Sequence, residues 1–240
     1  MAKMTLDELV AQLRSALGNG LQCVVLYGSA AGGEHIAKRS DYNVLVIVDE
    51  LPAERLQAAS AVSAAWSETG NPAPLILTAE EWRSSADIFA MEYADILERH
   101  RVLYGAPPFD GIRVDSRDLR LQLEHEAMGK LLKLRRGVLS AGNSADKQIE
   151  LLDASVSTIM VLFRAFLRLH GERPPADNVA LSAAVGIRAG FNTDAFAKVV
   201  RHARGEAKIS SSDVGPVLHD YVRGVDRVAR YLDQWTAPQI

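Results

Sequence analysis

The chain has 240 residues, of which 48% are hydrophobic and 24% are charged, a composition typical of a folded globular protein with a sizeable core. Its formal charge of −3 and pI near 6.1 give no general attraction for nucleic acid or an anionic membrane, so we expect neither as a partner. The single cysteine, Cys23, excludes internal disulfides and cysteine-rich zinc sites.

No segment has the pattern of a membrane span or a secretory signal. The first ten residues include acids and lack a long apolar stretch. The most apolar helical stretch, residues 159–169, is interrupted by Arg164 and Arg168. We therefore expect a cytoplasmic protein. A homodimer is compatible with the sequence, which leaves the oligomeric state open.

Helical and strand patterns alternate in the first hundred residues. Residues 5–17 predict an amphipathic helix capped by Thr5 and Glu8, because this pair satisfies backbone N–H groups of the first turn. The apolar runs 21–27 and 44–48 predict buried strands. The further elements expected here are a helix over 52–69, a strand over 73–78, a short helix capped by Thr78, a helix over 87–98 and a strand over 101–104. This alternation predicts a sheet with flanking helices.

The pattern changes after Gly105-Ala-Pro-Pro108, a turn signal that we interpret as a domain boundary. Nearly everything beyond it has helical periodicity. The helices expected there cover residues 116–140, 145–169, 177–189, 193–204 and 213–235. We therefore expect an α+β fold, in which a domain over residues 1–106 with a mixed sheet and flanking helices precedes an all-α helical bundle over residues 107–240.

A candidate site lies between the two apolar runs. Gly28-Ser29 follows the first run, and Asp41-Tyr42-Asn43 leads into the second. A strand that ends in Gly-Ser before a helix start can present backbone N–H groups and a hydroxyl to an anion. An acid at the mouth of the next strand can hold a metal ion beside that anion, as phosphate-ester chemistry requires. A plain turn at Gly28-Ser29 and a capping role for Asp41 are the alternatives.

In these residues the sequence resembles the polymerase-β-like nucleotidyltransferase superfamily, and within it the aminoglycoside-type and minimal nucleotidyltransferases. That signature is Gly-Ser, roughly ten residues, then Asp-x-Asp or Asp-x-Glu on a strand, with a third carboxylate on a later strand. Gly28, Ser29 and Asp41 match the signature, whereas Asn43 stands in place of its second acid. The motif resemblance covers about the first hundred residues, and only the architecture is similar beyond them.

The resemblance implies transfer of a nucleoside monophosphate, AMP from ATP in the simplest case, to a hydroxyl of a small molecule or protein. The partners would then be a nucleoside triphosphate and that acceptor. It also implies that Asp41 and Asn43 are catalytic and ligate Mg²⁺ or Mn²⁺. The residues implicated in nucleotide binding are Gly28, Ser29, Lys38 and Arg39.

The third carboxylate is missing from its expected place, because Ala73 and Pro74 occupy the start of the strand over 73–78. Glu92 is a candidate metal ligand in its stead, and it shares a helix face with Asp95 three residues later. A solvated acidic face is the alternative for this pair. Since Asn43 and Ala73 replace acids, the alternative to an enzyme is an inactive relative that acts as a nucleotide sensor or an interaction module.

The helical half carries one further pattern. Arg164 and His170 have a spacing similar to the Arg–His pair of RNA-cleaving helical bundles of the HEPN group. Arg120 and His125 share this kind of spacing, which arises easily by chance. A position at a helix C-terminus, where the helix dipole favours an imidazolium, accounts for His170 without catalysis.

Overall fold

The structure, a computed structural model, describes residues 4–28, 30–31 and 41–236. Contacts divide the chain into two compact units, Met1–Val114 and Asp115–Ile240. Within the described ranges, no helix is both long enough and apolar enough to cross a membrane.

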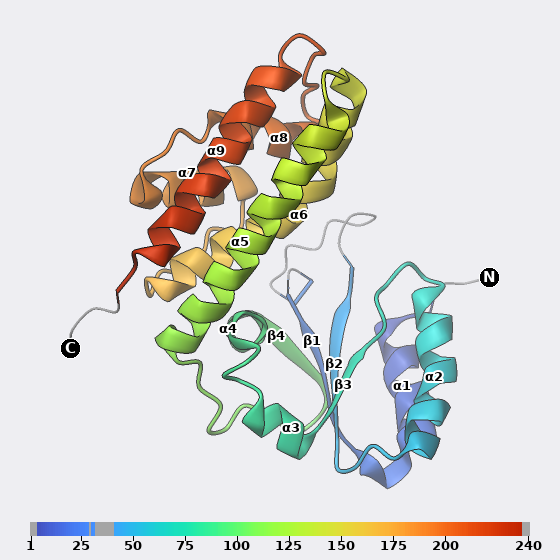
Figure 1. The fold of residues 1–240 in the computed structure, drawn as a ribbon. Coiled ribbons are helices and arrows are strands. Elements are labelled where there is room, and N and C mark those ends of the chain that lie inside the picture. Colours follow the sequence, from blue (N-terminus) through green and yellow to red (C-terminus); the bar gives the residue numbers. More distant parts are fainter. Residues whose placement is uncertain (1–3, 29, 32–40, 237–240) are drawn as a thin grey trace. The chain divides into compact units, whose positions relative to one another are not determined.

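The first unit is built on one sheet (Figure 1). Its strands, within the described residues, are β1 (Leu21–Tyr27), β2 (Asn43–Val48), β3 (Leu75–Thr78) and β4 (His100–Gly105). They lie in the order β3-β2-β1-β4, with β1 antiparallel to β2 and β4, and β2 parallel to β3. The mixed sheet expected from the sequence is therefore confirmed.

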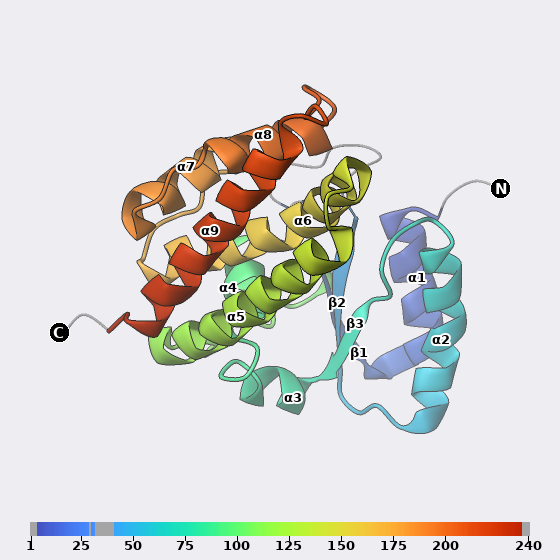
Figure 2. The same cartoon turned by 45° about the horizontal axis from the view of Figure 1, so that its top comes forward.

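Helices cover both faces of this sheet (Figures 1 and 2). They are α1 (Leu6–Leu17), the 3₁₀ turn η1 (Gly18–Gly20), α2 (Ala53–Ser67), α3 (Ala79–Ser84) and α4 (Ala90–Glu98). Helices α1 and α2 lie on one face, and α3 and α4 on the other. The predicted capping boxes are present at both Thr5 and Thr78, where each threonine accepts from the backbone of a glutamate three residues later.

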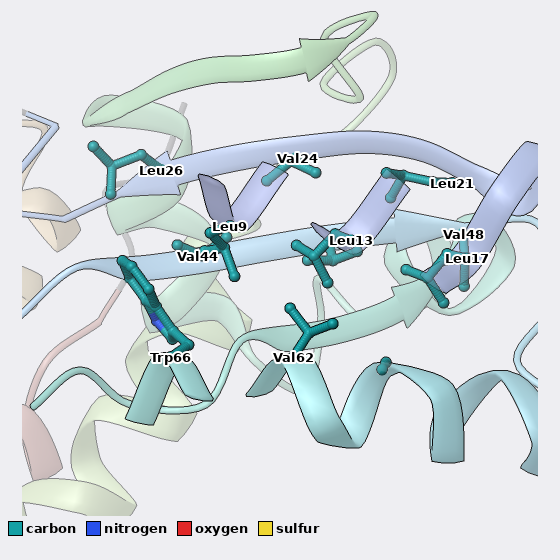
Figure 3. Packing of buried hydrophobic residues seen from close by; sticks show 12 residues of the cluster. Leu9, Leu13, Leu17, Leu21, Val24, Leu26, Val44, Val48, Val62 and Trp66 are labelled. Carbon is teal, nitrogen blue, oxygen red and sulfur yellow. The ribbon is translucent and has the colours of Figure 1, made fainter. Parts of the chain in front are cut away.

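Successive residues of β1 and β2 point alternately into two cores. The core beneath α1 and α2 includes Leu9, Leu13, Leu17, Val24, Leu26, Val44, Val48, Val62 and Trp66 (Figure 3). The core beneath α3 and α4 includes Cys23, Val25, Leu45, Ile47, Trp82, Tyr93 and Ile96. Because both faces are covered, the two central strands are apolar at nearly every position, which explains their continuous apolar runs.

The boundary between the units lies later in the chain than expected. After β4, the side chains of Phe109, Ile112 and Val114 pack against the core beneath α3 and α4. The indole N–H of Trp82 also donates to the carbonyl oxygen of Pro108 at 2.6 Å. The boundary expected at residue 106 therefore moves to Val114, and the Gly-Pro signal marks the end of a strand instead of the end of a domain.

The second unit is the expected helical bundle (Figure 2). The helices of its described part are α5 (Ser116–Ala141), α6 (Ala145–Leu169), α7 (Asn178–Ala189), α8 (Asp194–Ala203) and α9 (Val214–Asp233). Helix α5 packs against α6 and α9, while α7 and α8 pack against α6, α9 and each other. The centre of the bundle is aromatic, with Phe163, Phe166, Phe196 and Tyr221 fully buried.

Candidate functional site

Three strand ends meet at the two signature segments. The last residue of β1, Tyr27, pairs with Asn43 at the start of β2 and with His100 at the start of β4. Gly28 follows Tyr27 directly, and Asp41 is two residues before Asn43, exposed to solvent. Strand pairing thus brings Gly28 and the Asp41–Asn43 segment to one end of the sheet. We name this end, with Gly28, Asp41 and Asn43, the Gly28 end.

Gly28 has a backbone conformation that favours glycine. Its φ of +79° lies in the left-handed region that favours glycine. A Cβ atom there would lie 3.4 Å from Asn43 Nδ2 and 3.7 Å from Asp95 Oδ2. Its N–H donates to the carbonyl oxygen of Arg99 at 3.0 Å, and its carbonyl accepts from Ala31 N–H at 3.1 Å. Gly28 therefore shapes the turn, and a phosphate would have to be bound by N–H groups that follow it.

Helix α4 places two acids at the Gly28 end. Asp95 Oδ2 is the atom close to Gly28, and Glu92 is exposed one turn earlier. Burial raises the pKa of the Tyr27 phenol, and the negative charges of Asp95 and Glu92 raise it further. Asp95 therefore lies beside Gly28, and the charge of Glu92 also reaches the Tyr27 phenol. The sequence pattern predicts Glu92 as a candidate ligand, and for Asp95 it predicts only a place on the same helix face.

The Asp95 carboxylate is held in place by an ion pair. Arg99, four residues later and directly after the end of α4, contacts Asp95 Oδ1 through Nη2 at 2.5 Å. Both side chains are largely buried, with 13% of Arg99 and 24% of Asp95 exposed. Charge-assisted hydrogen bonds of this kind are strong and directional. Because Arg99 also accepts the Gly28 N–H through its carbonyl oxygen, one residue positions both the turn and the acid.

The start of β2 is held by the turn that precedes β3. Tyr42 N–H donates to the Asn71 side-chain oxygen at 2.9 Å, and the Tyr42 ring lies 6.2 Å from that of Trp66. The segment from Asp41 to Asn43 is therefore anchored at its middle residue. Ala73, which follows Asn71 and precedes β3, contributes no ligand side chain, as the sequence indicated.

Ser29, Lys38 and Arg39 lie outside the described residues, so their predicted roles stay predictions. Within the described part of the chain, no group of three or more acidic, histidine or cysteine side chains is arranged to hold a metal ion. Mg²⁺ is usually held by one or two carboxylates together with substrate phosphates. In ligand chemistry alone, the two carboxylates of Asp41 and Glu92 and the amide oxygen of Asn43 suit one such ion, and joint ligation by these residues stays a prediction.

Arg164 and His170 both make hydrogen bonds within the bundle. Arg164 donates to the side-chain oxygen of Asn178 at 2.7 Å. His170 contacts the carbonyl oxygen of Phe166 through Nδ1 at 2.8 Å and the Tyr231 hydroxyl through Nε2 at 2.9 Å. His170 caps the C-terminus of α6, as expected, and burial lowers its pKa, which opposes the positive charge that the helix dipole would favour. These contacts give both residues a structural role.

No protein-family model matches the chain, and neither does any curated protein. Among solved structures, the chain is similar to the spectinomycin adenyltransferase AAD(9) from Enterococcus faecialis, whose structure contains ATP and spectinomycin. The likeness has a TM-score of 0.59 at 12% sequence identity, and it covers 91% of this chain and 96% of that chain. The chain thus has the α+β fold of that adenyltransferase.

Proposed function

We propose that this protein binds a nucleoside triphosphate at the Gly28 end and transfers a nucleoside monophosphate, AMP from ATP, to a hydroxyl of a small-molecule or protein acceptor. The observation that carries this proposal is the convergence of Gly28 and Asp41 at one end of a sheet in this fold. The similar adenyltransferase, crystallised with ATP and an acceptor, supports the same assignment.

The turn after β1 would bind the triphosphate. Gly28 sets the direction of the turn, Ser29 offers a hydroxyl, and Lys38 and Arg39 supply positive charge. The acceptor oxygen attacks the α-phosphorus, a new P–O bond forms, the bond to the β-phosphate breaks, and pyrophosphate leaves. The protein's contribution is to hold the attacking acceptor oxygen and the leaving pyrophosphate oxygen in line on opposite sides of the α-phosphorus.

Asp41, Asn43 and Glu92 would hold a divalent ion beside the phosphates. When bound, Mg²⁺ or Mn²⁺ neutralises the charge that develops on the phosphate oxygens. Asn43 offers an oxygen ligand without a negative charge, so Glu92 supplies the charge that the signature's second acid would bring. Arg99 keeps Asp95 next to Gly28 and also accepts the Gly28 N–H, so Arg99 positions the turn.

A second function is favoured by Asn43 and Ala73, which stand where acids are expected. With fewer carboxylates, the Gly28 end would still bind the triphosphate but would not turn it over. The protein would then be an inactive relative that acts as a nucleotide sensor or an interaction module. Binding and pyrophosphate release have to be measured separately to distinguish the two functions.

Calorimetric titration of ATP, with and without Mg²⁺, tests the binding site. We expect Mg²⁺-dependent binding that Asp41→Ala weakens at least about tenfold, the effect of losing ~1.4 kcal/mol. Glu54→Ala is the matched control, because Glu54 is an exposed acid in the first turn of α2, which follows the other end of β2. Absence of ATP binding at every Mg²⁺ concentration would refute both functions.

Pyrophosphate release in the presence of hydroxyl-bearing acceptors, beginning with spectinomycin, tests the transfer step. Glu92→Gln should lower the rate at least about tenfold if Glu92 contributes charge at the metal ion. Asn43→Asp should tighten Mg²⁺ binding, because a carboxylate replaces an amide. Tight ATP binding without release, in wild type and in Asn43→Asp, would favour the sensor over the enzyme.

A further inference from the structure

Helix α5 carries an apolar stripe on its exposed side. The stripe, which we name the α5 stripe, consists of Leu121 (63% exposed), Met128 (45%), Leu132 (46%) and Leu139 (83%). A helix advances about 100° and 1.5 Å per residue, so the four side chains fall within an arc of about 40° along roughly 27 Å. The four side chains therefore align on one side of the helix, with the adjacent pair Met128 and Leu132 at the centre and Leu121 and Leu139 two turns beyond them at either end.

The bundle core does not account for this stripe. Helix α5 already buries its other side against α6 and α9, through residues that include Leu119, Leu123, Leu131 and Leu134. A helix that serves only one core has a polar outer face. In the described part of the second unit, the remaining exposed large apolar side chains are Val161 on α6 and Ile187 on α7. Contiguous exposed apolar surface typically marks an interaction site, whereas single residues do not.

We propose that the α5 stripe is a homodimer interface, in which α5 packs antiparallel against α5 of a second copy of this chain. The spacing of the stripe is self-complementary. Leu121 and Leu139 lie nine residues to either side of position 130, and Met128 and Leu132 lie two residues to either side. A twofold axis at position 130 places Leu121 against Leu139 of the second copy and Met128 against Leu132 of the second copy.

The charges that flank the stripe favour the antiparallel direction. Glu124 and Arg135 lie on the same flank of the stripe, so antiparallel pairing sets Glu124 against Arg135 of the second copy, twice by symmetry. On the other flank His125 meets Arg136, a pair without attraction. Parallel pairing would instead set Arg135 beside Arg136 of the second copy, and like charges would repel.

The flanking charges remain accessible in the single chain. Glu124 contacts Arg120 at 2.7 Å, and Arg135 contacts Asp226 at 2.9 Å. The side chain of Glu124 is nevertheless 27% exposed and that of Arg135 is 50% exposed. Each can therefore accept a second partner of opposite charge, and the pairing between copies adds to the contacts within each chain.

Sedimentation velocity across a range of protein concentrations tests the dimer. We expect a reversible monomer–dimer equilibrium whose dissociation constant rises at least about tenfold in the double variant Met128→Glu, Leu132→Glu, since charged groups then replace central apolar contacts. Ile187→Glu is the matched control, because Ile187 is 86% exposed and lies outside the stripe. A monomer at every concentration, or a dimer that the double variant leaves intact, overturns the proposal.

Disulfide trapping tests the direction of packing. A mixture of the Met128→Cys and Leu132→Cys proteins should form the mixed disulfide dimer faster than either protein forms its own. The natural thiol, Cys23, is 1% exposed and does not compete. Preferential self-pairing of Met128→Cys would contradict the antiparallel arrangement. A monomeric wild type whose melting temperature falls in the double glutamate variant would show that the stripe is covered within one chain, which also overturns the proposal.

Discussion

His170 has a hydrogen-bond partner at each of its two ring nitrogens, an arrangement that suits the neutral imidazole. Since a carbonyl oxygen can only accept, Nδ1 donates to Phe166, and Nε2 is left to accept from the Tyr231 hydroxyl. Protonation at Nε2 would reverse this hydrogen bond, so the Tyr231 hydroxyl would have to turn and accept instead. Burial, and to a smaller extent Arg188, lower the pKa of His170, outweighing the hydrogen bond to Phe166 and the charge of Glu172.

These contacts predict that the free energy of unfolding of the bundle falls at acidic pH. The pKa of His170 is lowered from 6.5 in the folded state, so the unfolded chain binds the proton first as the pH falls. The stabilisation is complete above about pH 6.5 and is lost as the pH falls through that value toward the lower, folded-state pKa. Urea unfolding at about pH 7.5 and about pH 5.5 should show a larger loss of stability in wild type than in His170→Asn.

The same substitution at an exposed histidine controls for this effect. His219→Asn, on the solvent side of α9, should keep the pH dependence of wild type. Equal pH dependence in wild type and His170→Asn would show that His170 does not titrate on unfolding.

At the candidate site, sequence spacing predicted Gly28, Asp41 and Asn43, because a short motif between two apolar runs is a local pattern. It did not identify Arg99, whose carbonyl oxygen binds the turn and whose guanidinium holds Asp95. Acids three residues apart predict a shared helix face, but only packing decides what that face meets.

Among the secondary-structure elements, local sequence signals predicted whether a segment is a helix or a strand better than they predicted where it begins and ends. The capping boxes at Thr5 and Thr78 gave correct helix starts, since the bonds lie within four residues. The strand expected from Ala73 begins at Leu75 instead, after Pro74, which has no N–H to donate to a neighbouring strand. The ends of a strand depend on pairing partners that are distant in sequence, so the sequence predicts these ends less accurately than it predicts helix starts.

At Gly105, the last residue of β4, the backbone lies so close to β1 that a side chain has no room. Its φ is +79°, and a Cβ atom there would lie 1.9 Å from the Gln22 carbonyl oxygen. Gly105→Ala should therefore lower the free energy of unfolding by roughly 3 kcal/mol or more, as strain and overlap combine. Gly111→Ala is the control, because Gly111 has a φ of +77° and open space around the Cβ position. It should lose only about 1 kcal/mol.

Urea unfolding of both alanine variants measures this difference. Equal losses at the two glycines would mean that backbone strain alone matters at Gly105 and that β4 can shift away from Gln22 without penalty.

For the molecule as a whole, the packing of the segment 107–114 predicts where the chain can be divided. A fragment of residues 1–114 should unfold cooperatively, since it keeps both cores of the sheet. A fragment of residues 1–106 loses the contacts of Phe109, Ile112 and Val114 and the acceptor for the Trp82 indole. It should be less stable by at least about 2 kcal/mol.

Urea titrations of the two fragments, followed by tryptophan fluorescence, compare them directly. If the two fragments unfold at the same urea concentration, residues 107–114 do not stabilise the first unit. The domain boundary would then lie at Gly105-Ala-Pro-Pro108, as the sequence pattern predicts.

The sequence by itself determined the kinds of elements and their order, the α+β division and the positions of the signature residues. These features depend on hydrophobic periodicity, caps and spacing, which act over a few residues. Only the tertiary structure decided that Gly28 meets Asn43 and Asp95, that residues 107–114 belong to the first unit, and that the described helices of the bundle leave one side of α5 uncovered. Contacts of that kind form between surfaces far apart in the chain, and they are selected by strand pairing and by the burial of apolar area, which a local pattern does not encode.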